Sequence, residues 1–344
     1  MSGAAITALI AGRRARAGRR RSILLVIAAL IAVCFALTLI LGQSLTPPAD
    51  VLRVLTGHDV PGASFTVGQL RLPRAVVAVL AGLSLGLGGA AFQVMLRNPL
   101  ASPDILGVSA GASAAAICGI VFLSLDGAAI FGLAIAAGLA VALLIYALSF
   151  RDGVTGSRLI LVGIGIAAML DSVIAYALAR APAWDLQEAL RWLGGSVNGA
   201  RLDQAPPLLA ALMLGGGLVL ARRRDLEVLR AGDDLAAALG VRVAGTRLAV
   251  MIGAVAMIAV ATATTGPVAF VAFLSGPIAA RIVGPHGSVL VPAALVGAVL
   301  VLAGDYAGQF LLPGRYPVGV VTGAAGAPFL IHLIIRANRN GASL

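Results

Sequence analysis

The feature of this sequence that most limits its fold is a series of ten long apolar runs joined by short polar loops. A helix needs roughly 20 apolar residues to cross a bilayer, whose hydrocarbon core admits only helices or closed barrels. Runs of this length without strict alternation are typical of helices. The runs are 22–41, 74–96, 105–123, 127–149, 158–179, 206–221, 246–264, 267–283, 289–312 and 318–335. The sequence therefore predicts an all-α, polytopic integral membrane protein with about ten transmembrane helices.

Composition supports one membrane domain that covers residues 1–344. The chain is 60% hydrophobic and only 11% charged, whereas soluble domains carry about 25% charged residues. An arginine-rich segment, 1–21, precedes the first run and gives the N-terminus the outline of a signal peptide. That run is about 20 residues long and lacks a small-residue cleavage site, so we interpret it as an uncleaved first span.

The arginines predict the orientation of the spans. All 25 basic residues are arginine. If the N-terminus lies inside and the spans alternate, 18 arginines fall on the inside and 7 on the outside. Positive residues favour the cytoplasmic side, so both termini are predicted to be cytoplasmic and the protein to reside in the plasma or inner membrane. The pI of about 11.3 then reflects topology and lipid contact, and no nucleic-acid partner is expected.

Residue types argue against an enzyme. Without lysine the chain has neither a phosphate-loop lysine nor a Schiff base. Cys34 and Cys118 lie inside apolar runs, which is typical of core residues rather than of a disulfide framework. His58, His286 and His332 lack ligand spacing. We expect no catalytic site, no metal site and no cofactor.

Two acidic residues, Asp171 and Asp305, lie within predicted spans. Charge in lipid is costly, so each is a candidate for the transport pathway, together with Tyr176. The alternative is a structural carboxylate that pairs within the bundle.

Two polar segments carry further candidate sites. The inside segment 222–246 contains Asp233 and Asp234, which start a short alanine-rich stretch that Gly240 ends, so a short cytoplasmic helix is predicted. On the outside, Arg71 and Arg74 precede the second span. They could anchor lipid headgroups or receive carboxylates from a docking protein.

An internal repeat is a weaker signal. Four residues at and just after the end of the second span recur at a fixed offset in the eighth. Both copies contain a proline at which we expect the helix to break, as transporter repeats often do. The matched residues are Phe92, Leu96, Pro99 and Ala101 with Phe270, Leu274, Pro277 and Ala279. Gly82, Gly86 and Gly89 are expected to serve close helix packing, and the alternative is a narrow substrate path that needs smooth walls.

Several motifs in order make the sequence similar to one known family. They are Arg71-Leu-Pro-Arg74, Asn98 to Pro103, Leu106 to Ala112, Gly232 to Val241, Gly266 to Phe270, Pro317 to Gly323 and Gly326 to Pro328. Together they resemble the FecCD family of permeases, the type II importers of ferric siderophores, haem and cobalamin, over almost the whole chain.

The resemblance implies a ten-helix subunit that pairs with a second permease, two cytoplasmic ATPases and an external substrate-binding protein. It implies that Gly232, Asp233, Asp234, Leu239 and Gly240 form the coupling helix on the ATPase. Arg71 and Arg74 match docking arginines for the binding protein.

Two further assignments follow from the resemblance. The cytoplasmic gate corresponds to Thr155, Gly156 and Ser157. Gln309 stands where some relatives carry a third docking arginine, and we expect Arg315 to supply that charge instead.

The resemblance predicts an importer permease, with ferric siderophore as the first choice of cargo and haem or cobalamin as alternatives. A secondary transporter that uses Asp171 and Asp305 as ion relays is the other class. Such a carrier would need neither the short cytoplasmic helix nor the outside arginines. Whether the second permease is a paralogue or another copy of this chain is left open by the sequence.

Overall fold

The computed structural model describes residues 3–103, 107–149, 156–284 and 287–339. Within these ranges the chain is helical and contains no strand. Seven helices are long and apolar enough to span a membrane, and three shorter apolar helices accompany them. The prediction of about ten apolar helices is therefore confirmed. These helices are α1 (Gly3–Ile40), α3 (Leu72–Leu96), α4 (Val108–Leu123), α5 (Gly127–Ser149), α6 (Gly156–Arg180), α8 (Ala205–Ala221), α11 (Val243–Thr265), α12 (Val271–Val283), α13 (Leu290–Tyr306) and α14 (Val318–Arg339).

Short helices fill the connections between the long ones. The short helices are α2 (Pro48–Leu55), α7 (Ala183–Leu193), α9 (Arg223–Leu229) and α10 (Asp233–Ala238). Of these, α10 is the predicted cytoplasmic helix, and the other three were not predicted, because their apolar stretches are too short to stand out. π-Helical turns, Ser64–Arg71 and Ala307–Leu311, border α3 and α13, and a 3-10 turn, Leu202–Gln204, leads into α8.

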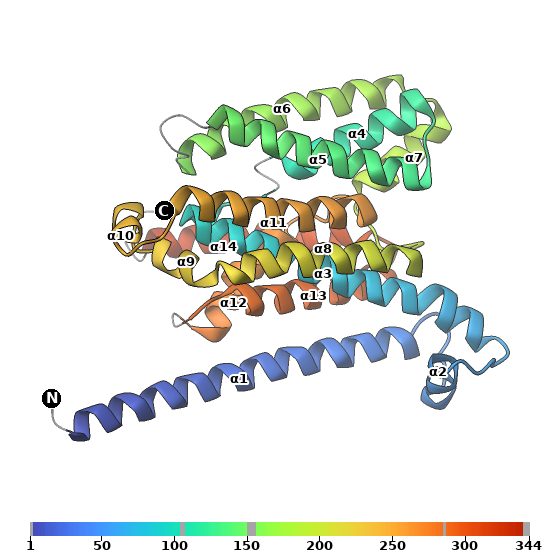
Figure 1. The fold of residues 1–344 in the computed structure, drawn as a ribbon. Coiled ribbons are helices and arrows are strands. Elements are labelled where there is room, and N and C mark those ends of the chain that lie inside the picture. The colour runs from blue at the N-terminus through green and yellow to red at the C-terminus, as the bar shows by residue number, and fades with distance from the viewer. Residues whose placement is uncertain (1–2, 104–106, 150–155, 285–286, 340–344) are drawn as a thin grey trace.

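Helix α3 is the centre of the bundle, and α8, α11, α12 and α13 pack around it (Figure 1). Glycines permit this close packing. A Cβ on Gly82 would lie 2.5 Å from the Gly297 carbonyl oxygen of α13, and one on Gly89 would collide with the backbone of Ala272 in α12. Small residues let helix backbones approach in this way, so the packing role expected for these glycines agrees with the structure.

Helices α4, α5, α6 and α7 form a second layer with its own apolar core, which joins the first through contacts of α11 with α4 and α5. Burial differs sharply between helices. In the span that contains α3, 78% of the apolar 18-residue stretch is buried, whereas the corresponding stretch is 22% buried in α6 and 17% buried in α1. The exposed faces of α1 and α6 are apolar and suit lipid or another membrane protein.

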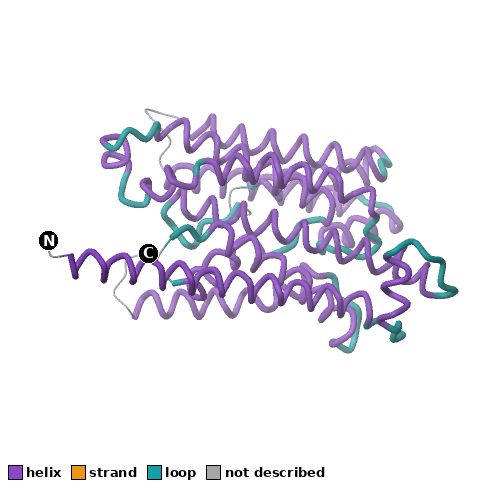
Figure 2. Tube along the Cα trace, turned by 60° about the horizontal axis from the view of Figure 1, so that its bottom comes forward, coloured by secondary structure: helices purple, strands orange, loops and turns teal. Residues whose placement is uncertain are grey.

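The bundle has two chemically different ends. The N-terminus, α9, α10 and the end of α14 lie at one end, and α2 and α7 lie at the other (Figures 1 and 2). We name them the inner end and the outer end, after the orientation that the arginines predict.

The repeat does not produce two equivalent helix breaks. Pro99 follows α3 in a non-helical segment, but Pro277 lies inside α12, which continues from Val271 to Val283. The expectation that Pro277 breaks a helix was wrong. A proline leaves the carbonyl four residues earlier without its helical donor, and here the Gln93 side-chain amide of α3 donates to that carbonyl, Phe273, at 2.8 Å.

Candidate functional site

A buried ion pair joins the start of α3 to the end of α13 at the outer end. Arg74 donates from Nε to one carboxylate oxygen of Asp305 at 2.5 Å and from Nη2 to the other at 2.6 Å. The Asp305 side chain is 4% exposed and that of Arg74 15%. Arg74 also donates to the Asn198 side-chain oxygen at 3.2 Å. Paired geometry of this kind satisfies both charges within the bundle.

Arg71 stabilises the end of α1. Its guanidinium donates to the carbonyl oxygens of Leu39, Ile40 and Ser44 at 2.8–3.0 Å and to the Thr46 hydroxyl at 3.1 Å. The last carbonyls of a helix have no partner inside it, so a cation that binds them stabilises the helix end. Arg71 therefore performs a structural task in this chain.

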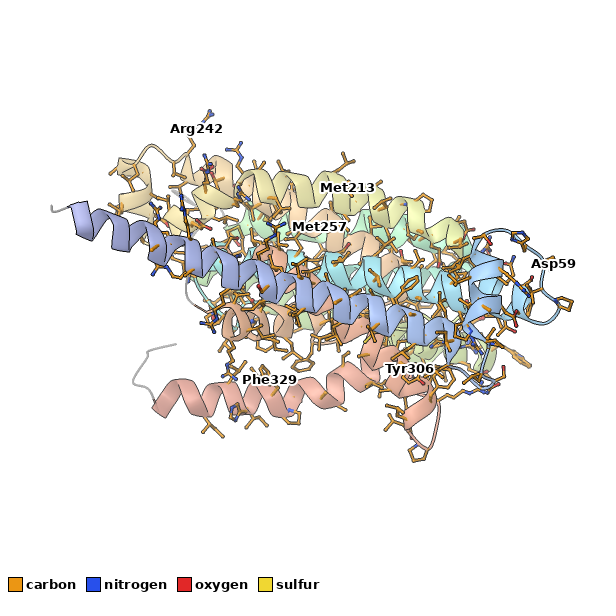
Figure 3. The ribbon with its side chains drawn as sticks, turned by 90° about the horizontal axis from the view of Figure 1, so that it is seen from below. Asp59, Met213, Arg242, Met257, Tyr306 and Phe329 are labelled. Atoms are coloured by element: carbon orange, nitrogen blue, oxygen red, sulfur yellow. The ribbon has the colours of Figure 1, made fainter. Side chains whose placement is uncertain are left out.

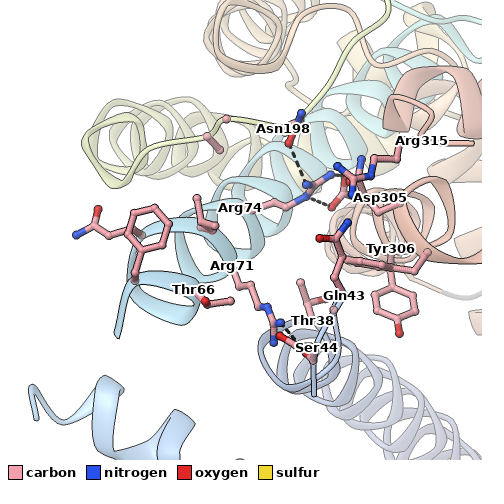
Figure 4. Close-up of a pocket in the computed structure, with 18 of the residues that line it drawn as sticks. Thr38, Gln43, Ser44, Thr66, Arg71, Arg74, Asn198, Asp305, Tyr306 and Arg315 are labelled. Carbon is pink, nitrogen blue, oxygen red and sulfur yellow. Dashed lines mark hydrogen bonds and ion pairs between the residues drawn. The ribbon is translucent and has the colours of Figure 1, made fainter. Parts of the chain in front are cut away.

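The outer end is hollowed between α1, α3 and α13, where a cavity of about 650 Å³ is lined by Arg71, Arg74 and Asp305 (Figure 4). Arg201 and Arg315 line the same cavity. Four arginines against one aspartate make it a place for an anionic group, although Arg71 and Arg74 already have internal partners.

Arg315 is the exposed member of the predicted docking set. It points towards the Arg74–Asp305 pair in Figure 4, and none of the ion pairs among the described residues includes it. Arg315 and Gln309 also border a neighbouring cavity of about 300 Å³, together with Glu188 and Arg191. The structure thus brings Arg71, Arg74 and Arg315 to one end, and docking by them stays a prediction.

At the inner end, α10 is flanked by two glycines with positive φ, Gly232 at 115° and Gly240 at 87°. Asp233 in its first turn is 2.9 Å from Arg247 of α11 and 3.5 Å from Arg97, which follows α3. These contacts fasten α10 to two long helices.

The outward surface of α10 is apolar. Leu235 is 50% exposed and Leu239 is 65% exposed, whereas Ala236 between them is buried. Residues four apart share a helical face, so the two leucines form one exposed apolar patch. We call Leu235 and Leu239 the α10 leucines. Exposed leucines at the end of a membrane bundle, beside acidic Asp234, suit a protein partner.

The predicted gate and pathway residues are scattered. Thr155 lies outside the described residues, and Gly156 and Ser157 are the first residues of α6. Asp171 and Tyr176 lie on the exposed face of α6, and Tyr176 receives the Arg180 guanidinium over its ring at 5.6 Å. Asp305 lies apart from Asp171 and Tyr176, at the outer end, where Arg74 binds its carboxylate.

The sequence reasoning missed Gln93 and Asn198. Gln93 is 7% exposed, and its side-chain nitrogen donates to the carbonyls of both Pro99 and Phe273. A polar side chain inside the apolar run before Pro99 was the available signal. Asn198 had no such signal, because it lies in a loop and acquires its role only through Arg74.

The long apolar helices define a polytopic membrane protein. A family model described as the FecCD transport family matches residues 29–336. The chain therefore belongs to the FecCD transport family, as the motif resemblance predicted.

Individual relatives agree with this assignment. The ferric enterobactin transport system permease protein FepG of Escherichia coli is 39% identical, over 85% of this chain and 88% of its own. The achromobactin transport system permease protein CbrC of Dickeya dadantii is also 39% identical, over 92% of this chain and 90% of its own. A solved structure described as an inward-facing metal-chelate type ABC transporter has a similar fold, with a TM-score of 0.82 at 24% identity over 92% of this chain and 99% of that one.

Proposed function

We propose that this chain is the membrane permease of an ABC importer that carries a ferric siderophore into the cell. The observation that carries the proposal is the 39% identity, over most of the chain, with two permeases named for siderophore transport. A permease for such a large cargo needs exposed faces on which its partners can bind. Helices α6 and α10 have such faces.

The α10 leucines are the surface on which we place the ATPase. A nucleotide-hydrolysing partner must push on the bundle through a rigid contact, and Asp233 ties α10 to α3 and α11 through Arg97 and Arg247. Gly240→Val tests this role. A Cβ there meets no atom within 4 Å, so only the positive φ opposes it, and we expect lost coupling in a folded bundle.

Gly57→Val is the matched control, because Gly57 has φ +86° and equally open surroundings at the outer end. ATP-dependent uptake and co-purification with the ATPase are the measurements. Equal losses in both variants would contradict a specific role for α10.

At the outer end we place the binding protein over the cavity that Arg315 borders. Exposed guanidinium groups pair well with acidic side chains of a partner. Arg315→Glu should weaken docking, and more so at low salt, because such contacts are screened. Arg53→Glu is the control, since the Arg53 side chain is 67% exposed at the same end. If both variants bound the binding protein equally well, Arg315 would not belong to the interface.

The exposed face of α6 is where we place the second permease and the path of the cargo. Asp171 and Tyr176 would then line the passage from this subunit, with Thr155, Gly156 and Ser157 at its cytoplasmic mouth. Asp171→Asn is expected to change uptake with little change in stability, because the carboxylate is exposed in the isolated chain. Uptake equal to that of the wild type would exclude a pathway role.

The function itself is tested by uptake of radioactive iron in cells that lack this chain. We expect iron to enter with a siderophore only when the chain is restored, and ATP depletion to stop it. If the chain restored uptake of haem or cobalamin instead, the proposed cargo would be wrong and that compound would take its place. Uptake that survives ATP depletion but collapses with the ion gradient would indicate a secondary transporter.

A further inference from the structure

A basic cavity lies at the inner end, between the start of α1, α9 and the end of α12. Its volume is about 640 Å³. Six arginines line it: Arg13, Arg16, Arg19 and Arg20 from α1, and Arg223 and Arg224 from α9. The single acidic residue in the lining is Glu227. The cavity therefore carries a strong positive charge.

Arg20 is held in place by the chain, and four of the arginines around it take part in none of the ion pairs of the described residues. Arg20 donates to the Ser288 carbonyl oxygen, which fastens α1 to the segment that precedes α13. Among the ion pairs of the described residues, none includes Arg16, Arg19, Arg223 or Arg224. Like charges gathered in this way repel one another, so an external anion would relieve the repulsion.

A second cavity is also lined by residues of α1, and its lining is almost wholly apolar. It has a volume of about 710 Å³ and lies between α1, α3 and the start of α8. Ile31, Ala32 and Phe35 form its α1 wall, and Leu209 belongs to its α8 wall. In Figure 3, α1 runs the length of the molecule, from the end near Arg242 towards the opposite end.

The spacing of the two cavities matches one leaflet of a bilayer. Helix α1 borders both, and Ile31 comes eleven positions after Arg20. At a rise of 1.5 Å per residue these side chains lie ~16 Å apart along the helix. Half of the bilayer's hydrocarbon core is ~15 Å thick. An acyl chain that starts at the arginines would thus reach the apolar cavity.

We propose that the two cavities form one site for an anionic phospholipid of the cytoplasmic leaflet. The arginines bind its phosphate, because guanidinium groups match phosphate oxygens in geometry and charge. An acyl chain fills the apolar cavity between α1 and α8. Basic pockets beside membrane helices on the cytoplasmic side recognise such headgroups. A soluble phosphate would contact the arginines alone and would not occupy the apolar cavity.

The test uses the full chain in maltoside detergent and native mass spectrometry with added dioleoyl phosphatidylglycerol. Dioleoyl phosphatidylcholine serves as the zwitterionic comparison. The headgroup variant is Arg16→Gln/Arg19→Gln/Arg223→Gln/Arg224→Gln, and the control is Arg53→Gln/Arg201→Gln, which changes exposed arginines of the outer end. We expect the headgroup variant to lose about tenfold or more in apparent affinity for phosphatidylglycerol, and the control to bind as the wild type does.

A second variant, Ala32→Trp, fills the apolar cavity from an exposed position of α1. It should weaken phosphatidylglycerol binding severalfold while all six arginines remain. Inorganic phosphate at millimolar concentration should compete only weakly.

Three results would overturn the proposal. One is unchanged phosphatidylglycerol binding in the headgroup variant. Another is full competition by inorganic phosphate together with normal binding by Ala32→Trp, which would mean a site for soluble phosphate. The third is loss of a co-purifying protein, with lipid binding intact, in the headgroup variant, which would assign the arginines to a protein interface.

Discussion

The arginines of the outer end and those of the inner end look alike in the sequence but differ in what they contact. Arg71 and Arg74 use their guanidinium groups inside the chain, on the end of α1 and on Asp305. At the inner end, Arg16 and Arg223 are exposed and line an open cavity. Arg71 and Arg74 therefore hold helices together, whereas Arg16 and Arg223 are left open to other molecules.

The largest effect is expected when one partner of the Arg74–Asp305 pair is removed. Arg74→Ala leaves a buried carboxylate without its cation, which costs about 3–5 kcal/mol of stability. Thermal unfolding in detergent measures the loss. Arg315→Ala, an exposed arginine of the same cavity, should have almost no effect. If the double variant Arg74→Ala/Asp305→Ala loses the sum of the two single losses, the residues do not act as a pair.

Removal of Arg71 should have the next largest effect. Arg71→Ala deletes hydrogen bonds from a charged donor to the end of α1. Because water can replace these exposed and part-buried bonds, we expect a net loss of about 1.5–3 kcal/mol. We expect a lower unfolding temperature and faster proteolysis of the 41–46 segment. The control is Arg201→Ala, because the Arg201 side chain is 75% exposed and its ion pair is with nearby Asp203. Equal proteolysis of the two variants would disprove the structural role of Arg71.

The link between α3 and α12 gives a sharper test of internal bonding near the inner end. Gln93→Leu leaves the Phe273 and Pro99 carbonyls without their donor, at a cost of about 1–3 kcal/mol. Pro277→Ala restores a backbone N–H that can donate to Phe273. The loss caused by Gln93→Leu should therefore be smaller in the Pro277→Ala background. Identical losses in both backgrounds, measured by thermal unfolding, would show that the proline is unrelated to Gln93.

The smallest stability effect is expected for the α10 leucines. Leu235→Ser/Leu239→Ser changes exposed side chains, so the free energy of unfolding should shift by no more than about 0.5 kcal/mol. Transport should nevertheless fall, because the patch serves a partner. Ala238→Ser, an exposed change on the same helix, is the control. A large drop in unfolding temperature would instead mean that these leucines belong to the core of the bundle.

Some of the candidate sites could be predicted from the sequence, and others could not. α10 was expected from Asp233, Asp234 and Gly240, because helix start and stop signals are local properties of the chain. The pairing of Arg74 with Asp305 could not be foreseen, since 231 residues separate them. Asp305 was recognised as a candidate for either a pathway or a structural carboxylate, and the structure pairs it with Arg74 in the described conformation.

Pro277 shows where local reasoning fails. A proline inside a helix removes one hydrogen bond, so a break is the local expectation. The tertiary structure supplies a replacement donor, Gln93, from a helix 180 residues away. The bundle can do this because glycines such as Gly89 bring α3 close to α12.

The sequence by itself determined the number and order of the apolar helices, the concentration of arginine at one side and the family. The hydrophobic effect and the cost of unpaired backbone groups in lipid act on every residue wherever it lies, so a linear pattern records them. Only the tertiary structure decided which arginines are bound and which are free to bind. That choice depends on which helices meet, and a short-range electrostatic contact exists only once packing has placed both charges within a few ångströms.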